Sequence, residues 1–395
     1  MIRNYSFSNF YSFRDITRIS LEVGQKPSSS GYDLTFSDGD RGNKVVAVVG
    51  ANGSGKTQLL RPPAFLSWFI ADSFTSLEPQ ERFPFKAHML TPDEPTEFEL
   101  FFDCRGEQYR YRLRLKETCV LYESLAVKTS HLFSHLFVRE QQQNGEYTYK
   151  QKNFGFGEIK AAKLRNNVSV ISAAHMQDSA LAEELVGYFR NFTCNIHVMG
   201  RSHYDPGKLL TSAHFFKEHV QLHAKAVKLL SSFDLGLNGV ELIDKNVTDE
   251  HQGEKSIVVP YGVHQSKGRE FRLSFLEESS GTQSAYVLLQ KVLPVLEEGG
   301  VAIIDELDND LHPHMLEALL DLFRFEHSNQ HHAQLIFSCH TPEVLNLLAK
   351  HQVYLVEKQD QHSDAWRLDQ IRGLRADDNL YAKYYAGALG AVPEL

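Results

Sequence analysis

Residues 50–57, which read Gly-Ala-Asn-Gly-Ser-Gly-Lys-Thr, constrain the fold of this 395-residue chain more than any other segment. The β-branched run 44–49 precedes them, and we expect a helix to begin at about Gly55. A glycine-rich turn between a buried strand and a helix is typical of a parallel α/β sheet, where ligands bind at the strand ends. The sequence therefore predicts an α/β fold built around a phosphate-binding loop.

The residue types in this loop suit a nucleoside triphosphate. The glycines let successive backbone N–H groups point at phosphate oxygens, and the helix N-terminus adds partial positive charge. Lys56 is expected to reach the β- and γ-phosphates, and the Thr57 hydroxyl to bind Mg²⁺. Pro62 and Pro63 predict a stop or sharp kink in the helix, with a second helix over 64–74. With ATP and Mg²⁺ as the expected cofactors, the nucleotide-binding candidates are Asn52, Gly53, Ser54, Gly55, Lys56 and Thr57.

Two acids and a histidine follow two other apolar runs. A strand predicted at 301–304 ends in Asp305 and Glu306, and a strand predicted at 334–338 leads to His340. Because the strands are expected to be parallel, all three side chains should meet at one sheet edge. Asp305 would hold Mg²⁺ through its water shell, Glu306 would orient or deprotonate the attacking water, and His340 would contact the γ-phosphate. The predicted catalytic residues are thus Glu306, His340 and Lys56.

The region after Gly281 alternates helix and strand, with a third strand expected at 352–357, and this alternation favours crossover helices on a parallel sheet. The segment Glu278-Ser279-Ser280-Gly281-Thr282-Gln283 lies at the start of the first of these helices. Taken alone, it is typical of a serine-capped helix start. Ser280 and the Gly281 N–H also suit an anion bound at that helix end.

Residues 96–116 predict an antiparallel hairpin with a turn at Arg105-Gly106. This register pairs Phe102 with Tyr109 on one face and Glu99 with Arg112 on the other, so that both faces are satisfied. The arginines on this strand would bind nucleic acid if they were unpaired. The opposing glutamates favour a solvated, self-neutralised face instead.

Shorter patterns complete the expected organisation. We expect a strand at 168–173, helices at 178–191 and 213–234, and strands at 240–247, 255–261 and 269–275. The predicted parts are an ATPase lobe at 1–95 with the phosphate loop, its antiparallel β part at 96–175, a mainly helical insertion at 176–268, and a second ATPase lobe at 269–395.

Composition limits the partners and the compartment. The net charge is −9, from 41 Lys and Arg against 50 Asp and Glu, so composition does not indicate nucleic acid as a partner, although local basic patches leave it open. The apolar runs are too short to span a bilayer, and the opening MIRNYSFSNF predicts no signal peptide. Four scattered cysteines without a CxxC pair favour a reducing cytoplasm and no membrane partner.

The order of the motifs resembles the ABC-ATPase heads of the SMC, RecF and OLD kind. More narrowly, the chain resembles the RloA/AbiL-type AAA ATPases of bacterial phage-defence and abortive-infection operons. The stretches that carry this resemblance are IRNYSFSNFYSFRD, EESSGTQS, IIDELDNDLHPHM, QLIFSCHTPEVL and LRADDNLYAKYYAGALGAVP. It covers nearly the whole chain, although the middle third matches in general pattern alone.

The resemblance implies assembly in trans, with Ser280 and Gly281 of one subunit capping the γ-phosphate bound by another. Thr282 stands where many ABC signatures have a second glycine, and Gln177 is the candidate for the Q-loop residue. The implied role is a sensor or regulator that acts as a homodimer or a larger homo-oligomer, together with an effector, a nuclease or toxin, encoded nearby.

Three other functions were weighed. A DNA-binding repair ATPase of the RecF or SMC kind is the main alternative, and the acidic balance counts against it. The long insertion between Lys56 and Ser280 disfavours the ATPase subunit of a membrane transporter. The acids of Asp308-Asn309-Asp310 are the pair that a metal-dependent nuclease would use, but we expect them to form the loop after the Asp-Glu strand.

Overall fold

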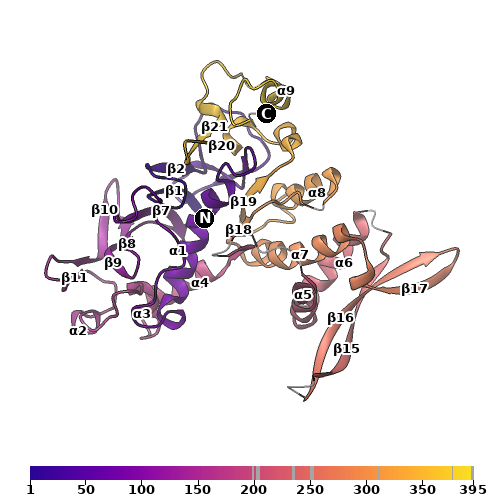
Figure 1. Ribbon diagram of the computed structural model, residues 1–395, viewed down its shortest axis with the longest axis horizontal. Coiled ribbons are helices and arrows are strands. Elements are labelled where there is room, and N and C mark those ends of the chain that lie inside the picture. The colour runs from indigo at the N-terminus through magenta and orange to yellow at the C-terminus, as the bar shows by residue number, and fades with distance from the viewer. Residues whose placement is uncertain are drawn as a thin grey trace.

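The computed structural model describes residues 1–197, 200–201, 205–233, 236–249, 253–309, 311–375 and 377–392. Its main body has two sheets with a long helix, α1 (Lys56–Ser76), packed between them. A β arm projects at the right of Figure 1, on the side away from the antiparallel sheet. The fold is α/β, with a central and largely parallel sheet beside an antiparallel one, as the sequence predicts.

The central sheet carries the strand that precedes the phosphate loop. Its order is β12-β18-β19-β6-β20-β21, and every neighbouring pair is parallel except the last. The predicted strands at 301–304, 334–338 and 352–357 are confirmed with small shifts at their ends. The six strands are β6 (Val45–Val49), β12 (Phe192–Cys194), β18 (Val301–Ile304), β19 (Gln334–Cys339), β20 (Val353–Gln359) and β21 (His362–Arg367).

Two separate cores cover the two faces of this sheet. All of β6 is buried, and its alternate residues enter different cores, because successive side chains of a strand point to opposite faces. Val46 and Val48 join the core that contains α1, whereas Val45, Ala47 and Val49 join the core that contains α7 (Ser280–Glu298) and α8 (Pro313–Arg324). Helices α1 and α7 therefore lie on opposite faces of the central sheet.

The antiparallel sheet, in the order β11-β10-β9-β8-β7-β1-β2, covers the outer side of α1. The predicted register of its β7–β8 hairpin is confirmed, since Phe102 pairs with Tyr109 and Glu99 with Arg112. Arg105 and Gly106 have φ angles of 49° and 85°, as a two-residue type I′ turn requires. The strands are β1 (Ile2–Ser8), β2 (Thr17–Ser20), β7 (Thr96–Cys104), β8 (Glu107–Lys116), β9 (Cys119–Lys128), β10 (Phe133–Gln141) and β11 (Tyr147–Gln151).

Helix α1 continues through Pro62 and Pro63, so the expected stop and separate second helix are wrong. A proline at position 63 cannot donate to the carbonyl of Leu59 four residues earlier. The buried phenol of Tyr5 donates to that carbonyl at 3.0 Å and replaces the missing helix bond. The helix therefore keeps its course because a neighbouring strand supplies one hydrogen-bond donor.

The strand expected at 168–173 is also wrong, because this segment forms helix α3 (Val170–His175). The Ser169 hydroxyl caps the helix by accepting from the amide of Ile171 at 3.1 Å. The buried carboxylate of Glu123 accepts from the Val170 amide at 2.9 Å and from the Ser169 hydroxyl at 2.7 Å. A carboxylate at a helix N-terminus is favourable, so a residue distant in sequence fixes the helix start.

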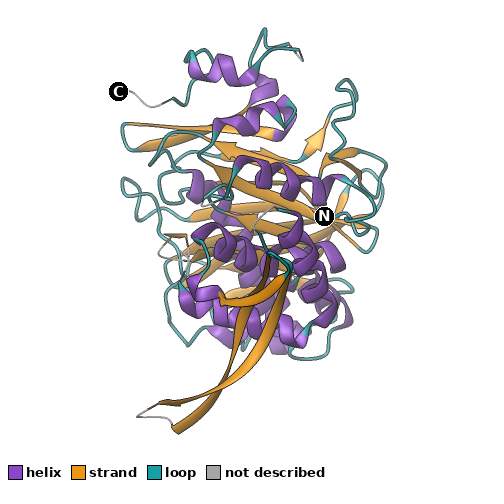
Figure 2. Cartoon of the chain, turned by 90° about the vertical axis from the view of Figure 1, so that its right-hand side faces the viewer, coloured by secondary structure: helices purple, strands orange, loops and turns teal. Residues whose placement is uncertain are grey.

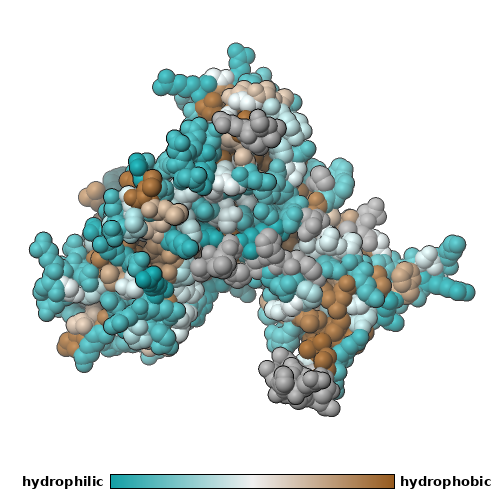
Figure 3. Space-filling view, viewed as in Figure 1, coloured by the Kyte–Doolittle hydropathy of each residue, from teal (hydrophilic) through white to brown (hydrophobic). Residues whose placement is uncertain are grey.

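The single helix expected at 213–234 is two helices, α5 (Pro206–Glu218) and α6 (Val220–Ser232). His219 separates them with φ −115° and ψ 69°, which are not helical angles. Beyond them, β15 (Gly239–Asp249), β16 (Gly253–Ser266) and β17 (Arg269–Ser274) form the arm, which extends away from the body in both ribbon views (Figures 1 and 2). Figure 3 shows apolar side chains gathered over this arm.

The remaining elements are short, apart from helix α4, which packs on α1 and α3. The remaining helices and strands are β3 (Glu22–Val23), β4 (Asp33–Thr35), β5 (Arg41–Asn43), α2 (Glu158–Ala161), α4 (Ala180–Arg190), β13 (Ile196–His197), β14 (Gly200–Arg201) and α9 (Leu380–Tyr385).

No helix among the described residues is both long enough and apolar enough to span a bilayer.

Candidate functional site

The phosphate loop leaves β6 and enters α1 through backbone angles that need glycine. Gly53 and Gly55 have φ angles of 76° and 113°, in the left-handed region. A Cβ on Gly50 would lie 2.2 Å from the carbonyl oxygen of Val356. These positions tolerate no ordinary side chain, so the loop curls closely at the start of α1, as a phosphate cradle requires.

Lys56 lies folded back over this loop. Its Nζ donates to the carbonyl oxygens of Gly50 at 2.8 Å and Ala51 at 3.1 Å. Burial lowers the pKa of the Lys56 ammonium, and the nearby carboxylates of Asp305 and Glu306 oppose that shift. A triphosphate bound in the loop would give this ammonium a charged partner in place of two carbonyls.

Thr57 and Asp305 meet as the motifs predict. The Thr57 hydroxyl donates to Oδ2 of Asp305 at 2.7 Å, and Asp305 is almost completely buried. Among the described residues, no group of three or more His, Cys, Asp or Glu side chains is arranged to hold a metal ion. A hydroxyl beside one carboxylate fits Mg²⁺, which usually takes few protein ligands and completes its shell with water and phosphate oxygens.

Asp305 is fixed by two neighbouring segments. The Ser338 hydroxyl, on β19, donates to its Oδ1. Asn195, just after β12, makes two hydrogen bonds to the Asp305 backbone: its Oδ1 accepts from the amide at 2.7 Å, and its Nδ2 donates to the carbonyl at 2.9 Å. Neither residue is a candidate in the sequence analysis: Ser338 belongs to the strand before His340, which was assigned no role of its own, and Asn195 lies in no motif.

Glu306 and His340 also meet at this edge. Nε2 of His340 lies 3.0 Å from Oε1 of Glu306, and the guanidinium of Arg201 pairs with Oε2. Burial raises the pKa of the Glu306 carboxyl, but the hydrogen bond from His340 and the charge of Arg201 outweigh it, so that pKa lies below its ordinary value. Glu306 is therefore held as a carboxylate, the form that a general base needs.

The loop after Glu306 uses Asp308 as a structural acceptor. Its carboxylate accepts from the backbone amides of His340 at 3.1 Å and Thr341 at 2.7 Å. Burial raises the pKa of the Asp308 carboxyl. The hydrogen bonds from the Thr341 hydroxyl and from these two amides lower that pKa by more, so it lies below its ordinary value. Asp308 thus positions the His340 segment, which supports the loop interpretation over a nuclease site; Asp310 lies outside the described residues.

Ser280 and Gly281 lie at the first turn of α7, where Ser279 is the capping residue and accepts from the Thr282 amide at 3.2 Å. Ser280 is exposed. In the described part of the chain, no hydrogen bond or ion pair joins Ser280 or Gly281 to residues 50–57. They belong to the helix on the opposite face of the central sheet from α1.

Gln177 does not lie near these groups. It is exposed in the turn between α3 and α4, and the predicted strand before it is a helix. The Ser172 hydroxyl of α3 accepts from the amide of Phe74, near the last turn of α1. Lys56 is at the other end of this helix, roughly 30 Å away at 1.5 Å per residue. Asn195 and Arg201 contact Asp305 and Glu306 at the sheet edge instead.

The sequence matches one protein-family model. Residues 45–346 match the sequence model of a family described as "AAA domain, putative AbiEii toxin, Type IV TA system". This match spans more than half of the chain. No curated protein matches the sequence.

Similar solved structures include three SMC heads. The SMC head domain from Thermotoga maritima is 15% identical with a TM-score of 0.45, over 93% of this chain and 98% of that chain. An SmcHead bound to the C-winged helix domain of ScpA is 13% identical with a TM-score of 0.48, over 93% and 99%. A Smc head with an extended coiled coil, bound to the C-terminal domain of ScpA derived from Pyrococcus furiosus, is 12% identical with a TM-score of 0.46, over 93% and 97%.

Proposed function

Because this chain belongs to the AAA-domain family that matches residues 45–346, we propose that it binds and hydrolyses ATP with Mg²⁺. The observation that carries this proposal is the contact of Thr57 with Asp305 beside the phosphate loop, at 2.7 Å. A hydroxyl and a carboxylate at that place would hold the ion, which neutralises charge on the transferring phosphoryl group.

The chain's own residues divide the chemistry. The loop amides and Lys56 bind the phosphates, and Glu306 takes the proton from the attacking water. His340 contacts Glu306 in this structure at 3.0 Å, and its proposed role is to contact the γ-phosphate as well. Asp308 and Asn195 hold the backbone of His340 and Asp305 in place.

We further propose that two copies complete each site. Ser280 and Gly281 are on the opposite face of the central sheet from the phosphate loop helix, which supports a site in which a second copy brings them to the triphosphate. The exposed position of Ser280 in the first turn of α7 suits the terminal phosphate bound by a neighbouring subunit. The closed assembly is then a homodimer or a larger ring built from dimers.

The cellular role proposed is a sensor or regulator of an associated effector in a bacterial anti-phage system of the abortive-infection kind. Its support is the family description together with an ATPase site that lacks other visible effector chemistry among the described residues. ATP binding would close the assembly, and hydrolysis would reset it or release the effector, a nuclease or toxin.

The test is the hydrolysis rate of Glu306→Gln beside the wild type. The variant should bind ATP, hydrolyse it at least a hundredfold more slowly, and accumulate as the closed assembly. Wild-type turnover by Glu306→Gln would show that Glu306 is not the base.

The RecF-like alternative makes a different prediction, namely salt-sensitive DNA binding and DNA-stimulated ATPase activity. The structure supplies a reason to rank it second. Arg112 and Arg114 of β8 pair with Glu99 and Glu97 of β7, with 3.7 Å between Arg114 Nε and Glu97 Oε1. These arginines are already neutralised on the strand face.

A further inference from the structure

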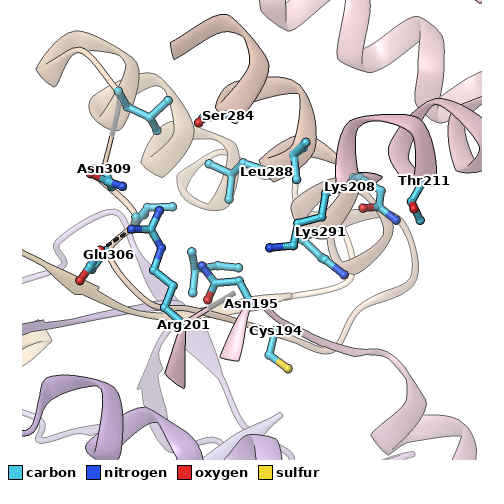
Figure 4. A pocket seen from close by; sticks show the side chains of 15 residues that line it. Cys194, Asn195, Arg201, Lys208, Thr211, Ser284, Leu288, Lys291, Glu306 and Asn309 are labelled. Atoms are coloured by element: carbon cyan, nitrogen blue, oxygen red, sulfur yellow. Dashed lines mark hydrogen bonds and ion pairs between the residues drawn. The ribbon is translucent and has the colours of Figure 1, made fainter. Parts of the chain in front are cut away.

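A pocket of about 270 Å³ lies directly behind Glu306. It is lined by Cys194, Asn195 and Arg201, by residues of helices α5 and α7, and by the loop after β18 (Figure 4). Its volume is close to the lower end of the range for small-molecule sites. Its lining combines apolar side chains, such as Leu288 and Leu311, with hydroxyl groups of Thr211 and Ser284.

The charge of this pocket is opposite to that of the whole chain. Arg201, Lys208 and Lys291 line it, and among the described lining residues Glu306 alone carries a carboxylate, whereas the chain carries a net charge of −9. In the close-up, Arg201 faces the two lysines across the pocket (Figure 4). Within the described ranges, the ammonium of Lys291 makes no ion pair. Arg201 pairs with Glu306, and Lys208 lies 3.4 Å from Asp205, so Lys291 supplies the excess positive charge that favours an anionic ligand.

Arg201 connects this pocket to the catalytic edge. Its side chain is 13% exposed, and its guanidinium pairs with Glu306. The same group contacts the side-chain oxygen of Asn309 at 2.7 Å and 2.9 Å once that amide is oriented to accept. Its Nε is buried without a hydrogen-bond partner in the described part of the structure. Arg201 therefore has an unused donor beside the pocket while it occupies the carboxylate that hydrolysis needs.

We propose that this pocket binds a small organic phosphate, and that the bound phosphate competes with Glu306 for Arg201. The guanidinium and the two ammonium groups match a phosphate, which arginine binds through paired hydrogen bonds. The hydroxyl and apolar walls match a hydroxylated organic part of a few carbons. The proposed competition rests on the proposed ATPase function, because its effect is to release Glu306 to act on water. The binding of a phosphate in the pocket does not depend on that function.

The consequence is activation by the ligand. In this structure Arg201 engages one oxygen of Glu306 and His340 the other, so each oxygen already has a cationic or N–H partner that competes with a water molecule. A phosphate in the pocket turns the guanidinium away and leaves one carboxylate oxygen open. ATP hydrolysis should then rise with ligand concentration and saturate.

Binding is tested by calorimetry on the full chain loaded with Mg²⁺ and a non-hydrolysable ATP analogue, so that the phosphate loop is blocked. The probes are ribose 5-phosphate and inorganic phosphate, and the first should bind more tightly because it also contacts the pocket walls. Arg201→Gln and Lys291→Gln should each weaken binding of ribose 5-phosphate at least tenfold. Lys116→Gln, at the exposed end of β8, is the control: it removes one positive charge outside the pocket and should leave the binding of ribose 5-phosphate unchanged.

The outcomes separate the two claims. No binding of either probe, or equal binding by the wild type and both pocket variants, would overturn the site. Tighter binding of a 5′-phosphorylated oligonucleotide, with the same dependence on Lys291, would overturn the small-molecule assignment. Ribose 5-phosphate that binds without raising ATP hydrolysis would overturn the competition. A chain that binds the probe but never hydrolyses ATP would refute the proposed function and leave the pocket standing.

Discussion

The hydroxyl of Thr57 donates a 2.7 Å hydrogen bond to the carboxylate of Asp305, across 248 positions of sequence. Thr57 lies in the first turn of helix α1 and Asp305 directly follows strand β18, so two adjacent layers of the fold meet at this contact. Ser338 and Asn195 fix the second partner from the neighbouring strands. This contact places the expected ion site at the carboxyl edge of the central sheet.

Asp305→Asn should abolish most ATP hydrolysis and raise the Mg²⁺ concentration needed for the remainder. The amide keeps the shape of the side chain but removes the charge that the ion needs. Hydrolysis should be measured across a Mg²⁺ titration, with Asp93→Asn in an exposed loop as the matched control. An Asp305→Asn enzyme with the wild-type Mg²⁺ dependence would exclude this residue as an ion ligand.

Arg201 and Glu306 should be energetically coupled in a pH-dependent way. The pKa of Glu306 is lowered in the folded state, so their attraction stabilises the fold above the ordinary pKa of 4.5 and is lost as pH falls through the folded value. A double-mutant cycle of Arg201→Gln and Glu306→Gln, measured by urea denaturation, should give roughly 1 kcal/mol at pH 7. The coupling should shrink on acidification below 4.5; a coupling that is constant with pH would contradict the ion pair.

Tyr5→Phe should destabilise the protein by about 1–3 kcal/mol, because it leaves the buried Leu59 carbonyl without a donor. The phenol supplies the bond that Pro63 cannot. Tyr385→Phe, at a position 64% exposed, is the control and should change stability little. Replacing Pro63 with Ala in the Tyr5→Phe protein should recover part of the loss in thermal unfolding. No recovery would show that the two residues do not act on the same carbonyl.

Asn195 should act as a positioning residue for Asp305. Asn195→Ala removes both hydrogen bonds to the Asp305 backbone, and the expected result is a fall in kcat of about tenfold or more with little change in KM for ATP. Asn195→Asp keeps the acceptor for the Asp305 amide and should retain more activity than the alanine variant. Equal loss of kcat and of thermal stability in both variants would indicate a purely structural role.

The sequence predicted the parts of this fold whose signals are local. The phosphate loop, the strand before Asp305 and the β7–β8 register each follow from adjacent residues, and each is confirmed in its structure. The roles assigned to the site residues remain predictions, although the structure brings Thr57, Asp305, Glu306 and His340 together.

The parts that could not be predicted depend on contacts between distant residues. Helix α1 continues through two prolines with a donor from Tyr5, and helix α3 stands in place of a predicted strand with Glu123 accepting from its first amide, that of Val170. Asn195 and Arg201 reach the site from a segment without a motif, whereas Gln177 lies beside the opposite end of α1. The boundaries proposed for the four parts of the chain rest on the sequence pattern alone.

The most direct test of the shared site mixes two inactive variants. Lys56→Ala lacks the phosphate-binding lysine, and Ser280→Arg blocks the first turn of α7; each alone should hydrolyse almost no ATP. If subunits exchange freely, half of the dimers are mixed and carry one intact site of two, so an equimolar mixture should recover about a quarter of wild-type activity. Full activity of Ser280→Arg alone, or no recovery in a mixture whose mass shows mixed dimers, would contradict a site built from two copies.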